Sequence, residues 1–226
     1  MATVILLRHG RTSANATGVL AGRTAGVKLD AVGREQAVRA ADRLAAVPLV
    51  AIVTSPLERC RQTARSVLDR QADPLPPTSL EKGIVECDYG DWQGRKLSEL
   101  AKEPLWSVVQ SQPSAAVFPG GESLAGMQAR SVAAIRRLDA EIEAEHGAGA
   151  VWVAVSHGDI IKSVLADALG MHLDLFQRIS VGPASLSIVH YGASRPDVVA
   201  TNTDSGDLSW LRRTAPAADA PVGGGA

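Results

Sequence analysis

The feature that most constrains the fold is a set of short, almost continuously apolar runs that alternate with longer segments of helical periodicity. Three of these runs are predicted to be buried strands: Thr3 to Leu7, Val50 to Thr54 and Val151 to Val155. Strands that are apolar on both faces are typical of parallel sheets, because helices cover both sides. The alternation therefore predicts an α/β protein, a three-layer α/β/α sandwich with a mostly parallel central sheet.

Four longer segments show one apolar face at helical spacing: Gly33 to Ala46, Pro56 to about Arg70, Gly121 to Gly147, and Asp159 to Leu169. Prolines and glycines bound these segments, as expected at helix ends. Two later runs, Ser185 to His190 and Val198 to Asn202, are predicted to be further strands.

The length of the chain and its composition indicate one folded domain. A chain of 226 residues fits a single core, and we expect the domain to span residues 1–213. Residues 214–226 contain only Ala, Pro, Gly, Asp, Val and Thr. Such a segment has too little apolar bulk to offset its ordering entropy, so we expect a disordered tail.

Charge, hydropathy and cysteine content exclude several classes of protein. The 23 Lys and Arg residues nearly balance 24 Asp and Glu, which argues against a nucleic-acid or membrane-surface partner. No apolar run approaches the roughly 18 residues of a membrane span, and the N-terminus lacks a signal peptide's basic segment. Cys60 and Cys87 have no Cys-x-x-Cys partner, which favours reduced thiols. We therefore expect a cytoplasmic protein.

Charged and nucleophilic side chains follow three of the predicted strands. Arg8 and His9 come directly after the first strand, Arg59 lies just beyond the second, and His157 follows the third. Ligands of open α/β sheets bind where parallel strands end. Any one of these residues alone is more often structural, but together they predict an anion-binding site with a histidine nucleophile at one sheet edge.

With five motifs in the family's order, the sequence resembles the histidine phosphatase superfamily. It resembles the branch that includes cofactor-dependent phosphoglycerate mutases and small phosphatases. The motifs are Arg8-His9-Gly10, Ser55-Pro56-Leu57 leading to Arg59 and Thr63, Glu86 within Glu-Cys-Asp-Tyr-Gly-Asp-Trp-Gln-Gly, Gly120-Gly121-Glu122-Ser123, and Ser156-His157-Gly158. The resemblance covers about residues 3–190 and implies a phosphoglycerate mutase-like fold.

The resemblance implies a role for each matching residue. His9 would attack phosphorus and form a phosphohistidine, while Arg8, Arg59 and His157 would stabilise the phosphoryl oxygens. Asn15 and Gly158 would bind the same phosphate, and Glu86 would act as the general acid and base.

The resemblance implies neither a metal nor another cofactor. The positive charge that Mg²⁺ supplies in other phosphoryl-transfer sites would come from two arginines and a histidine. The partner would be a small phosphorylated metabolite.

For several residues the sequence leaves both a functional and a structural interpretation open. Glu86 also fits a surface acid paired with Lys82, and Glu122 fits either a substrate contact or a carboxylate at the start of a helix. Arg11 and Arg23 are open between substrate binding and the surface. Three histidines without a motif are expected to be structural: His146, His172 and His190. Trp92 and Trp106 fit either the rim of the pocket or packing, and large aromatic side chains favour packing.

The segment between Glu86 and His157 bears on the choice between phosphatase and mutase. Mutases of the family carry a basic lid there, whereas Trp106 to Val117 contains no Arg or Lys. We therefore expect a phosphatase of small metabolites, with a phosphomutase as the alternative and a catalytically silent phosphoester-binding module as a third reading. The residues leave open the exact substrate and whether the later strands form a homodimer.

Overall fold

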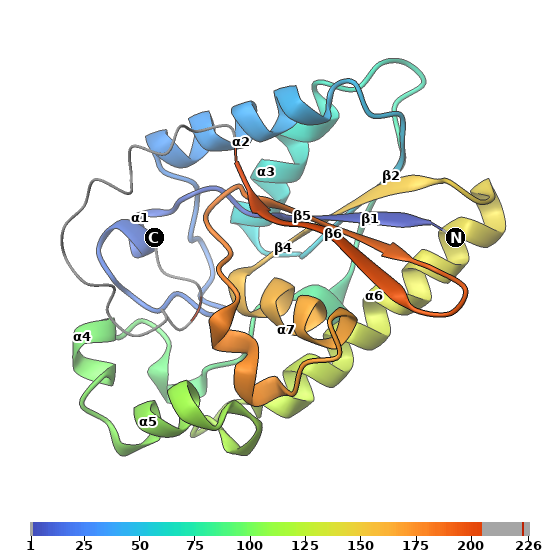
Figure 1. Cartoon of the computed structure of the whole chain (residues 1–226). Helices are drawn as coiled ribbons and strands as arrows, with labels where there is room; N and C mark the ends of the chain where they lie inside the picture. Colours follow the sequence, from blue (N-terminus) through green and yellow to red (C-terminus); the bar gives the residue numbers. More distant parts are fainter. Residues whose placement is uncertain (1, 205–222, 224–226) are drawn as a thin grey trace.

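The structure is a computed structural model that describes residues 2–204 and Gly223. The described residues form one six-stranded sheet in the order β3-β2-β4-β1-β5-β6 (Figure 1). Its strands are β1 Thr3–Arg8, β2 Leu49–Thr54, β3 Thr78–Leu80, β4 Val151–Ser156, β5 Leu186–Tyr191 and β6 Pro196–Thr203. The first four strands run parallel. On the side of β1, β5 pairs antiparallel with β1, and β6 pairs antiparallel with β5.

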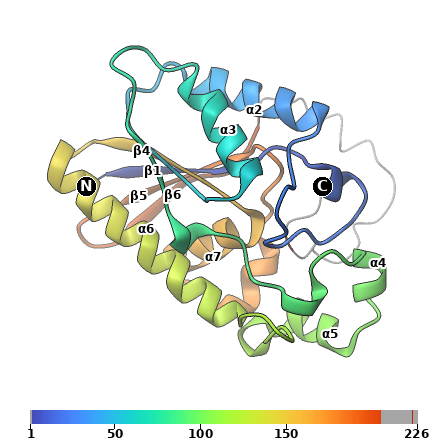
Figure 2. The same cartoon turned by 180° about the vertical axis from the view of Figure 1, so that it is seen from behind.

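Helices lie on both faces of this sheet (Figures 1 and 2). The α-helices are α1 Ser13–Ala16, α2 Ala31–Leu44, α3 Glu58–Leu68, α4 Leu97–Leu100, α5 Pro104–Ser111, α6 Leu124–His146 and α7 Gly158–Ala168. Short 3-10 turns are η1 Lys82–Ile84, η2 Gly90–Trp92, η3 Pro113–Ala115 and η4 Leu173–Arg178. The pair α2 and α3 covers one face, and α6 and α7 cover the other.

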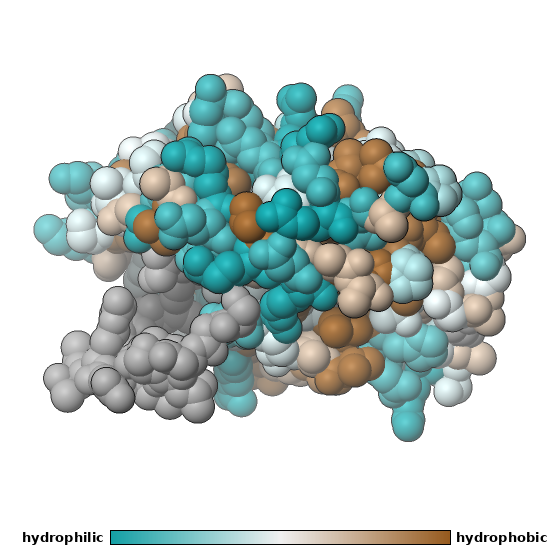
Figure 3. All heavy atoms as spheres, turned by 90° about the horizontal axis from the view of Figure 1, so that it is seen from above, coloured by the Kyte–Doolittle hydropathy of each residue, from teal (hydrophilic) through white to brown (hydrophobic). Residues whose placement is uncertain are grey.

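Two apolar cores follow from the alternation of side chains along the strands. On β1, Val4 and Leu6 belong to the core beneath α6 and α7, whereas Ile5 and Leu7 belong to the core beneath α2 and α3. From Val4 to Leu7, each β1 side chain is therefore buried on one side or the other. The surface above α2 and α3 is mostly hydrophilic, with apolar side chains scattered over it (Figure 3), as expected for helices with one buried face.

The predicted fold class is confirmed: the sheet is mostly parallel, and it is flanked by helices. All five predicted strands and four predicted helices are present, with ends that differ by a few residues. The sequence did not indicate β3, whose three residues are all exposed, nor the short helices α4 and α5. The tail expected over residues 214–226 lies outside the described residues, apart from Gly223. No described helix is long and apolar enough to cross a membrane.

Candidate active site

The ends of three parallel strands bring the charged residues together. In the sheet β4 lies between β2 and β1, and the pairing continues just beyond the strands. The backbone N–H of His9 donates to the Ser156 carbonyl at 3.0 Å, and the N–H of Ser55 donates to the Val155 carbonyl at 2.9 Å. The loops that follow β1, β2 and β4 therefore leave the sheet side by side.

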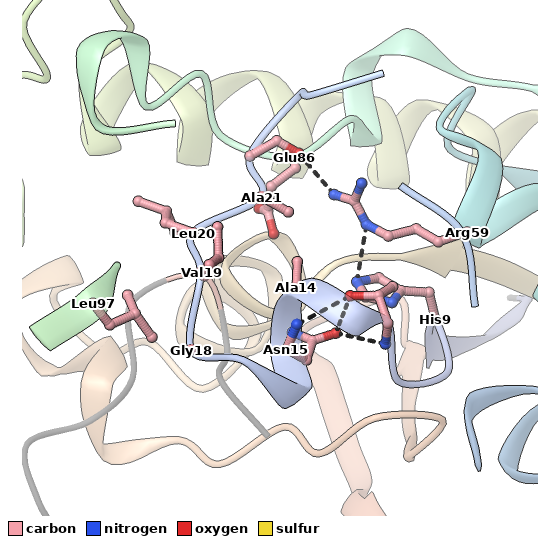
Figure 4. A pocket seen from close by; sticks show the side chains of 13 residues that line it. His9, Ala14, Asn15, Gly18, Val19, Leu20, Ala21, Arg59, Glu86 and Leu97 are labelled. Atoms are coloured by element: carbon pink, nitrogen blue, oxygen red, sulfur yellow. Dashed lines mark hydrogen bonds between the residues drawn. The ribbon is translucent and has the colours of Figure 1, made fainter. Parts of the chain in front are cut away.

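His9 lies in a pocket that Asn15, Arg59 and Glu86 also line (Figure 4). The imidazole is buried, and its Nδ1 lies 2.7 Å from the carbonyl oxygen of Gly10. A carbonyl only accepts hydrogen bonds, so Nδ1 carries the proton and donates. The other nitrogen, Nε2, is therefore left with its lone pair.

Arg59, in the first turn of α3, joins the two histidines. Its Nε donates to His9 Nε2 at 3.2 Å, and its Nη2 donates to His157 Nδ1 at 3.2 Å and to the Gly22 carbonyl at 2.8 Å. The rings of His9 and His157 meet edge to face with their centroids 5.3 Å apart. One guanidinium thus fixes the relative position of both imidazoles.

Ser55 orients His157 from the opposite side. Because His157 Nδ1 accepts from Arg59, its Nε2 carries the proton and donates to Ser55 Oγ at 2.7 Å. Both residues are fully buried. The sequence placed Ser55 in a family motif but gave it no role.

Glu86 is buried and lines the same pocket, so its interpretation as a surface acid paired with Lys82 is wrong. Its Oε1 accepts from the backbone N–H of Cys87 at 3.0 Å. Burial raises the pKa of Glu86 to about 7, and the carboxylate of Asp159 adds to the rise. At neutral pH this carboxyl group is poised to give or take a proton.

Burial and neighbouring charge also act on the basic residues. Burial lowers the pKa of His9 well below its ordinary value, and the positive charges of Arg59 and Arg8 lower it further. The pKa of His157 is lowered for the same reasons. Burial lowers the pKa of Arg8 to about 10, which leaves its guanidinium charged at neutral pH. The site therefore combines neutral imidazoles with a cationic arginine.

The remaining predicted residues are near the site but differ in how they face it. Arg8 and Gly158 are fully buried and do not line the pocket; Arg8 Nη1 donates to the Val181 carbonyl at 2.7 Å. Asn15 lines the pocket, with its Oδ1 accepting from the Thr12 N–H and hydroxyl at 3.0 and 2.8 Å. Its Nδ2 is thus the end that can donate to an anion.

The two ambiguous arginines and Glu122 have structural partners. Arg11 Nε donates to Asp30 at 2.8 Å, and Arg23 Nη2 donates to Glu122 at 2.9 Å. Glu122 does not line the pocket, and the side-chain cap of α6 comes from Ser123. Glu122 directly precedes Ser123, the N-cap of α6, and its carboxylate contacts Arg23 and Arg130, so the role of Glu122 stays a prediction.

The residues expected to be structural lie outside the pocket lining. His190 Nδ1 is 3.1 Å from Thr3 Oγ1 across the β1–β5 pair, and Trp92 stacks on Trp106 with centroids 6.2 Å apart. His146 ends α6, and His172 precedes η4. These positions agree with packing and capping roles.

A buried acid next to His157 escaped the sequence analysis. Asp159 is fully buried, and its Oδ2 accepts from the Tyr89 hydroxyl at 2.7 Å and from the N–H of Gly223 at 3.0 Å. Its Oδ1 lies 3.7 Å from Lys162 Nζ. An acidic residue in the first turn of a helix is ordinary, so nothing in the sequence distinguished this one.

Neutral residues form the outer wall of the pocket. Val19, Leu20 and Leu97 line it on the side away from α3 (Figure 4). Backbone hydrogen bonds join their two segments: Leu20 N–H donates to the Arg95 carbonyl, and Leu97 N–H to the Gly18 carbonyl, at 3.0 and 2.8 Å. Among the described lining residues, the charged side chains are those of Arg59 and Glu86.

The described residues contain no group of three or more His, Cys, Asp or Glu side chains placed to hold a metal ion. Metal-independent chemistry stays a prediction.

Comparison with known proteins agrees with this fold and shows the family. The family described as the histidine phosphatase superfamily (branch 1) matches residues 4–204. The chain therefore belongs to the histidine phosphatase superfamily. This confirms the family indicated by the motifs and, at the level of the family, an enzyme of the phosphomonoesterase type.

Relatives include both phosphatases and mutases. The chain is 33% identical to a glucosyl-3-phosphoglycerate phosphatase of Mycolicibacterium vanbaalenii, over 76% of each chain. It is 29% identical to a 2,3-bisphosphoglycerate-dependent phosphoglycerate mutase of Gloeobacter violaceus, over 74% of this chain and 75% of that one. Among solved structures, Bacillus stearothermophilus YhfR superimposes with a TM-score of 0.79 at 26% identity, covering 92% of this chain and 98% of that one.

Proposed function

We propose that this protein is a phosphatase that hydrolyses phosphomonoesters of small metabolites through a phosphohistidine on His9. The observation that carries the proposal is the hydrogen bond from His9 Nδ1 to the Gly10 carbonyl. It leaves the Nε2 lone pair beside Arg59 in the pocket. A neutral, oriented imidazole next to a fixed cation is what nucleophilic attack on a phosphate dianion requires.

In the first half-reaction, His9 Nε2 forms a bond to phosphorus while the bond from phosphorus to the ester oxygen breaks. The leaving alkoxide takes the proton of Glu86, whose raised pKa keeps the carboxyl group partly protonated at neutral pH. In the second, Glu86 takes a proton from water, whose oxygen attacks phosphorus as the bond to Nε2 breaks. Phosphate leaves, and His9 is neutral again.

The surrounding residues serve the phosphoryl oxygens. Arg59 lies against His9 Nε2, and Asn15 lines the pocket with its Nδ2 available to donate. Arg8 and His157 contribute from the buried side, and the N-terminal end of α7 at Gly158 adds its dipole. Preorganised donors of this kind favour the charge that spreads over the equatorial oxygens in the transition state.

We also propose that the alcohol part of the substrate carries no carboxylate. The described pocket offers it Val19, Leu20 and Leu97, while Arg11 and Arg23 are paired with carboxylates of the protein. Among the described lining residues Arg59 is the one cation, and it serves the phosphoryl group, so a substrate carboxylate would lose its hydration here without gaining a cation of its own. Phosphoglycerate, as substrate or mutase intermediate, fits these surroundings less well than a phosphoester whose alcohol part is uncharged.

The test compares glycerol 3-phosphate with 3-phosphoglycerate. The two compounds differ at one carbon, which is a hydroxymethyl group in glycerol 3-phosphate and a carboxylate in 3-phosphoglycerate. Free phosphate is recorded, together with 2-phosphoglycerate formed in the presence of the bisphosphorylated primer. We expect phosphate release without isomerisation, and a kcat/KM about tenfold or more higher for glycerol 3-phosphate. Rapid isomerisation would instead make the protein a mutase. Leu97→Arg is expected to reduce the difference in kcat/KM between the two substrates, because the added guanidinium can pair with the carboxylate of 3-phosphoglycerate.

The His9 assignment is tested by trapping. Wild-type protein quenched in alkali during turnover of a labelled phosphoester should retain acid-labile label, and His9→Ala should retain neither label nor turnover. His146→Ala is the matched control, because His146 ends α6 outside the pocket lining. Turnover by folded His9→Ala would refute the assignment.

Two further proposals concern the setting of the enzyme. A cytoplasmic location suits Cys60 and Cys87, which are buried free thiols. We also propose a homodimer that forms through the outer edge of β6. This strand lies at the edge of the sheet, and its Val199 side chain is 65% exposed. Sedimentation of the full chain at micromolar concentration would show twice the monomer mass, and a monomer would overturn the dimer.

A further inference from the structure

Glu122 is the centre of a compact charged cluster beside the pocket. Its Oε1 accepts from the backbone N–H of Asp88 at 2.8 Å, from Arg23 Nη2 at 2.9 Å and from Arg130 Nη2 at 2.6 Å. Its Oε2 accepts from Arg130 Nε at 3.0 Å, so Arg130 binds both oxygens. Although burial raises the pKa of Glu122, these donors lower it overall, and the carboxylate stays charged.

Both arginines of this cluster also bind the main chain of Glu86. Arg23 Nε donates to the Glu86 carbonyl at 2.8 Å, and Arg130 Nη2 donates to the same oxygen at 3.2 Å. Arg130 Nη1 donates to the carbonyl of Gly83 at 2.8 Å. Together with the bond from Asp88 N–H to Glu122, these contacts hold the backbone on both sides of Glu86.

The position of the Glu86 carboxyl group depends on that backbone. The Glu86 carboxylate accepts a hydrogen bond from the backbone N–H of the next residue, Cys87. The orientation of the side chain therefore depends on the backbone segment to which it belongs. Arg23 follows Gly22, whose carbonyl accepts from Arg59. The cluster therefore connects the segment of Glu86 with the loop that contacts Arg59.

We propose that Glu122 is a positioning residue, which fixes Glu86 against His9 by holding Arg23 and Arg130 on the Glu86 main chain. The inference rests on the proposed function of Glu86 as general acid and base. Glu122 itself does not line the pocket, so its effect on the reaction passes entirely through Glu86. Loss of the Glu122 carboxylate should shift Glu86 away from the leaving oxygen of the substrate and leave His9 in place.

The test uses leaving groups that differ in their need for a proton. Glu122→Gln keeps the size of the side chain and an oxygen for the Asp88 N–H, but loses the charge that binds the arginines. An alkyl phosphate needs protonation by Glu86, whereas an aryl phosphate leaves without it. We expect kcat to fall about ten- to hundredfold for the alkyl substrate, as a displacement near 1 Å produces, and less than about threefold for the aryl substrate.

A matched control separates positioning from general destabilisation. Asp167 also pairs with an arginine of α6, Arg136, at 2.6 Å, but it has no contact with the segment of Glu86 among the described bonds. Asp167→Asn is expected to leave the ratio of alkyl to aryl rates unchanged. Thermal unfolding of both variants reports whether either has lost its fold, and a folded Arg130→Lys variant serves where Glu122→Gln has not folded.

A double-mutant cycle gives the decisive result. In a Glu86→Gln background, Glu122→Gln should cause little further loss of alkyl phosphate turnover, because the residue through which it acts is already disabled. Additive losses, or equal losses for alkyl and aryl substrates, would overturn the positioning role. Wild-type protein that hydrolyses no phosphoester would instead refute the proposed function, so the two failures are distinguishable.

Discussion

The Nε of Arg59 lies 3.2 Å from the Nε2 of His9, on the nitrogen that carries the lone pair. The guanidinium N–H thus points at the lone pair that would attack phosphorus, and its charge adds to burial, the larger cause, in lowering the pKa of His9. When a phosphate dianion arrives, the same N–H groups can turn to its oxygens. One contact therefore prepares the nucleophile and the anion site together.

The pH dependence of kcat/KM follows from the two shifted groups. His9 must be neutral, and its pKa is lowered, so activity should be lost only as the pH falls well below 6.5. Glu86 must be protonated to act as acid, and its pKa is about 7, so activity should fall as the pH rises above that value. The dependence of kcat/KM on pH for an alkyl phosphate measures both the acidic and the alkaline limb. An alkaline limb that is unchanged in Glu86→Gln would contradict the assignment.

Arg59→Ala should lower kcat by about 10²–10³, as the loss of one preorganised transition-state donor does. Arg61→Ala is the control, because Arg61 is exposed on the same helix and does not line this pocket. Steady-state kinetics with one aryl phosphate compares the two variants. A near-normal rate for Arg59→Ala would mean that the guanidinium does not contact the reacting group.

Removal of metal ions should leave the activity within about twofold of its starting value. The positive charge at the site comes from arginines, and Arg8 stays charged at neutral pH with its pKa near 10, so no divalent cation is needed to neutralise the phosphoryl oxygens. Dialysis against a chelator, with parallel dialysis in buffer alone, measures the effect. Activity that is lost and then restored by Mg²⁺ would show that the arginines are insufficient.

The sequence predicted the strands and the charged residues at their ends because these features are local, whereas Asn15 and Glu86 were predicted only through the resemblance to the family. An apolar run followed by Arg8 and His9 marks a strand end whatever lies beside it, and three such ends place their residues at one sheet edge. Short, exposed β3 has no such signal, since its pairing depends on the neighbouring β2.

Contacts between distant segments could not be predicted from the sequence. Glu122 and Glu86 are 36 positions apart, and only the fold brings Arg23 and Arg130 between them. Gly10 illustrates the same limit. A Cβ atom at Gly10 would lie 2.3 Å from the carbonyl oxygen of Gly33, a close approach that only the folded chain reveals.

The close approach of α2 to the His9 loop gives a final prediction. A Cβ atom at Gly33 would overlap the carbonyl of Arg11, which is main chain and cannot move without shifting the loop. Gly33→Ala should therefore lower the free energy of unfolding by roughly 1–3 kcal/mol and reduce kcat through displacement of His9. Denaturant unfolding and aryl phosphate kinetics measure the two effects. Gly182→Ala is the control, since its Cβ would meet Asn202 Oδ1 at an ordinary 3.4 Å; equal unfolding midpoints for the two variants would contradict the account.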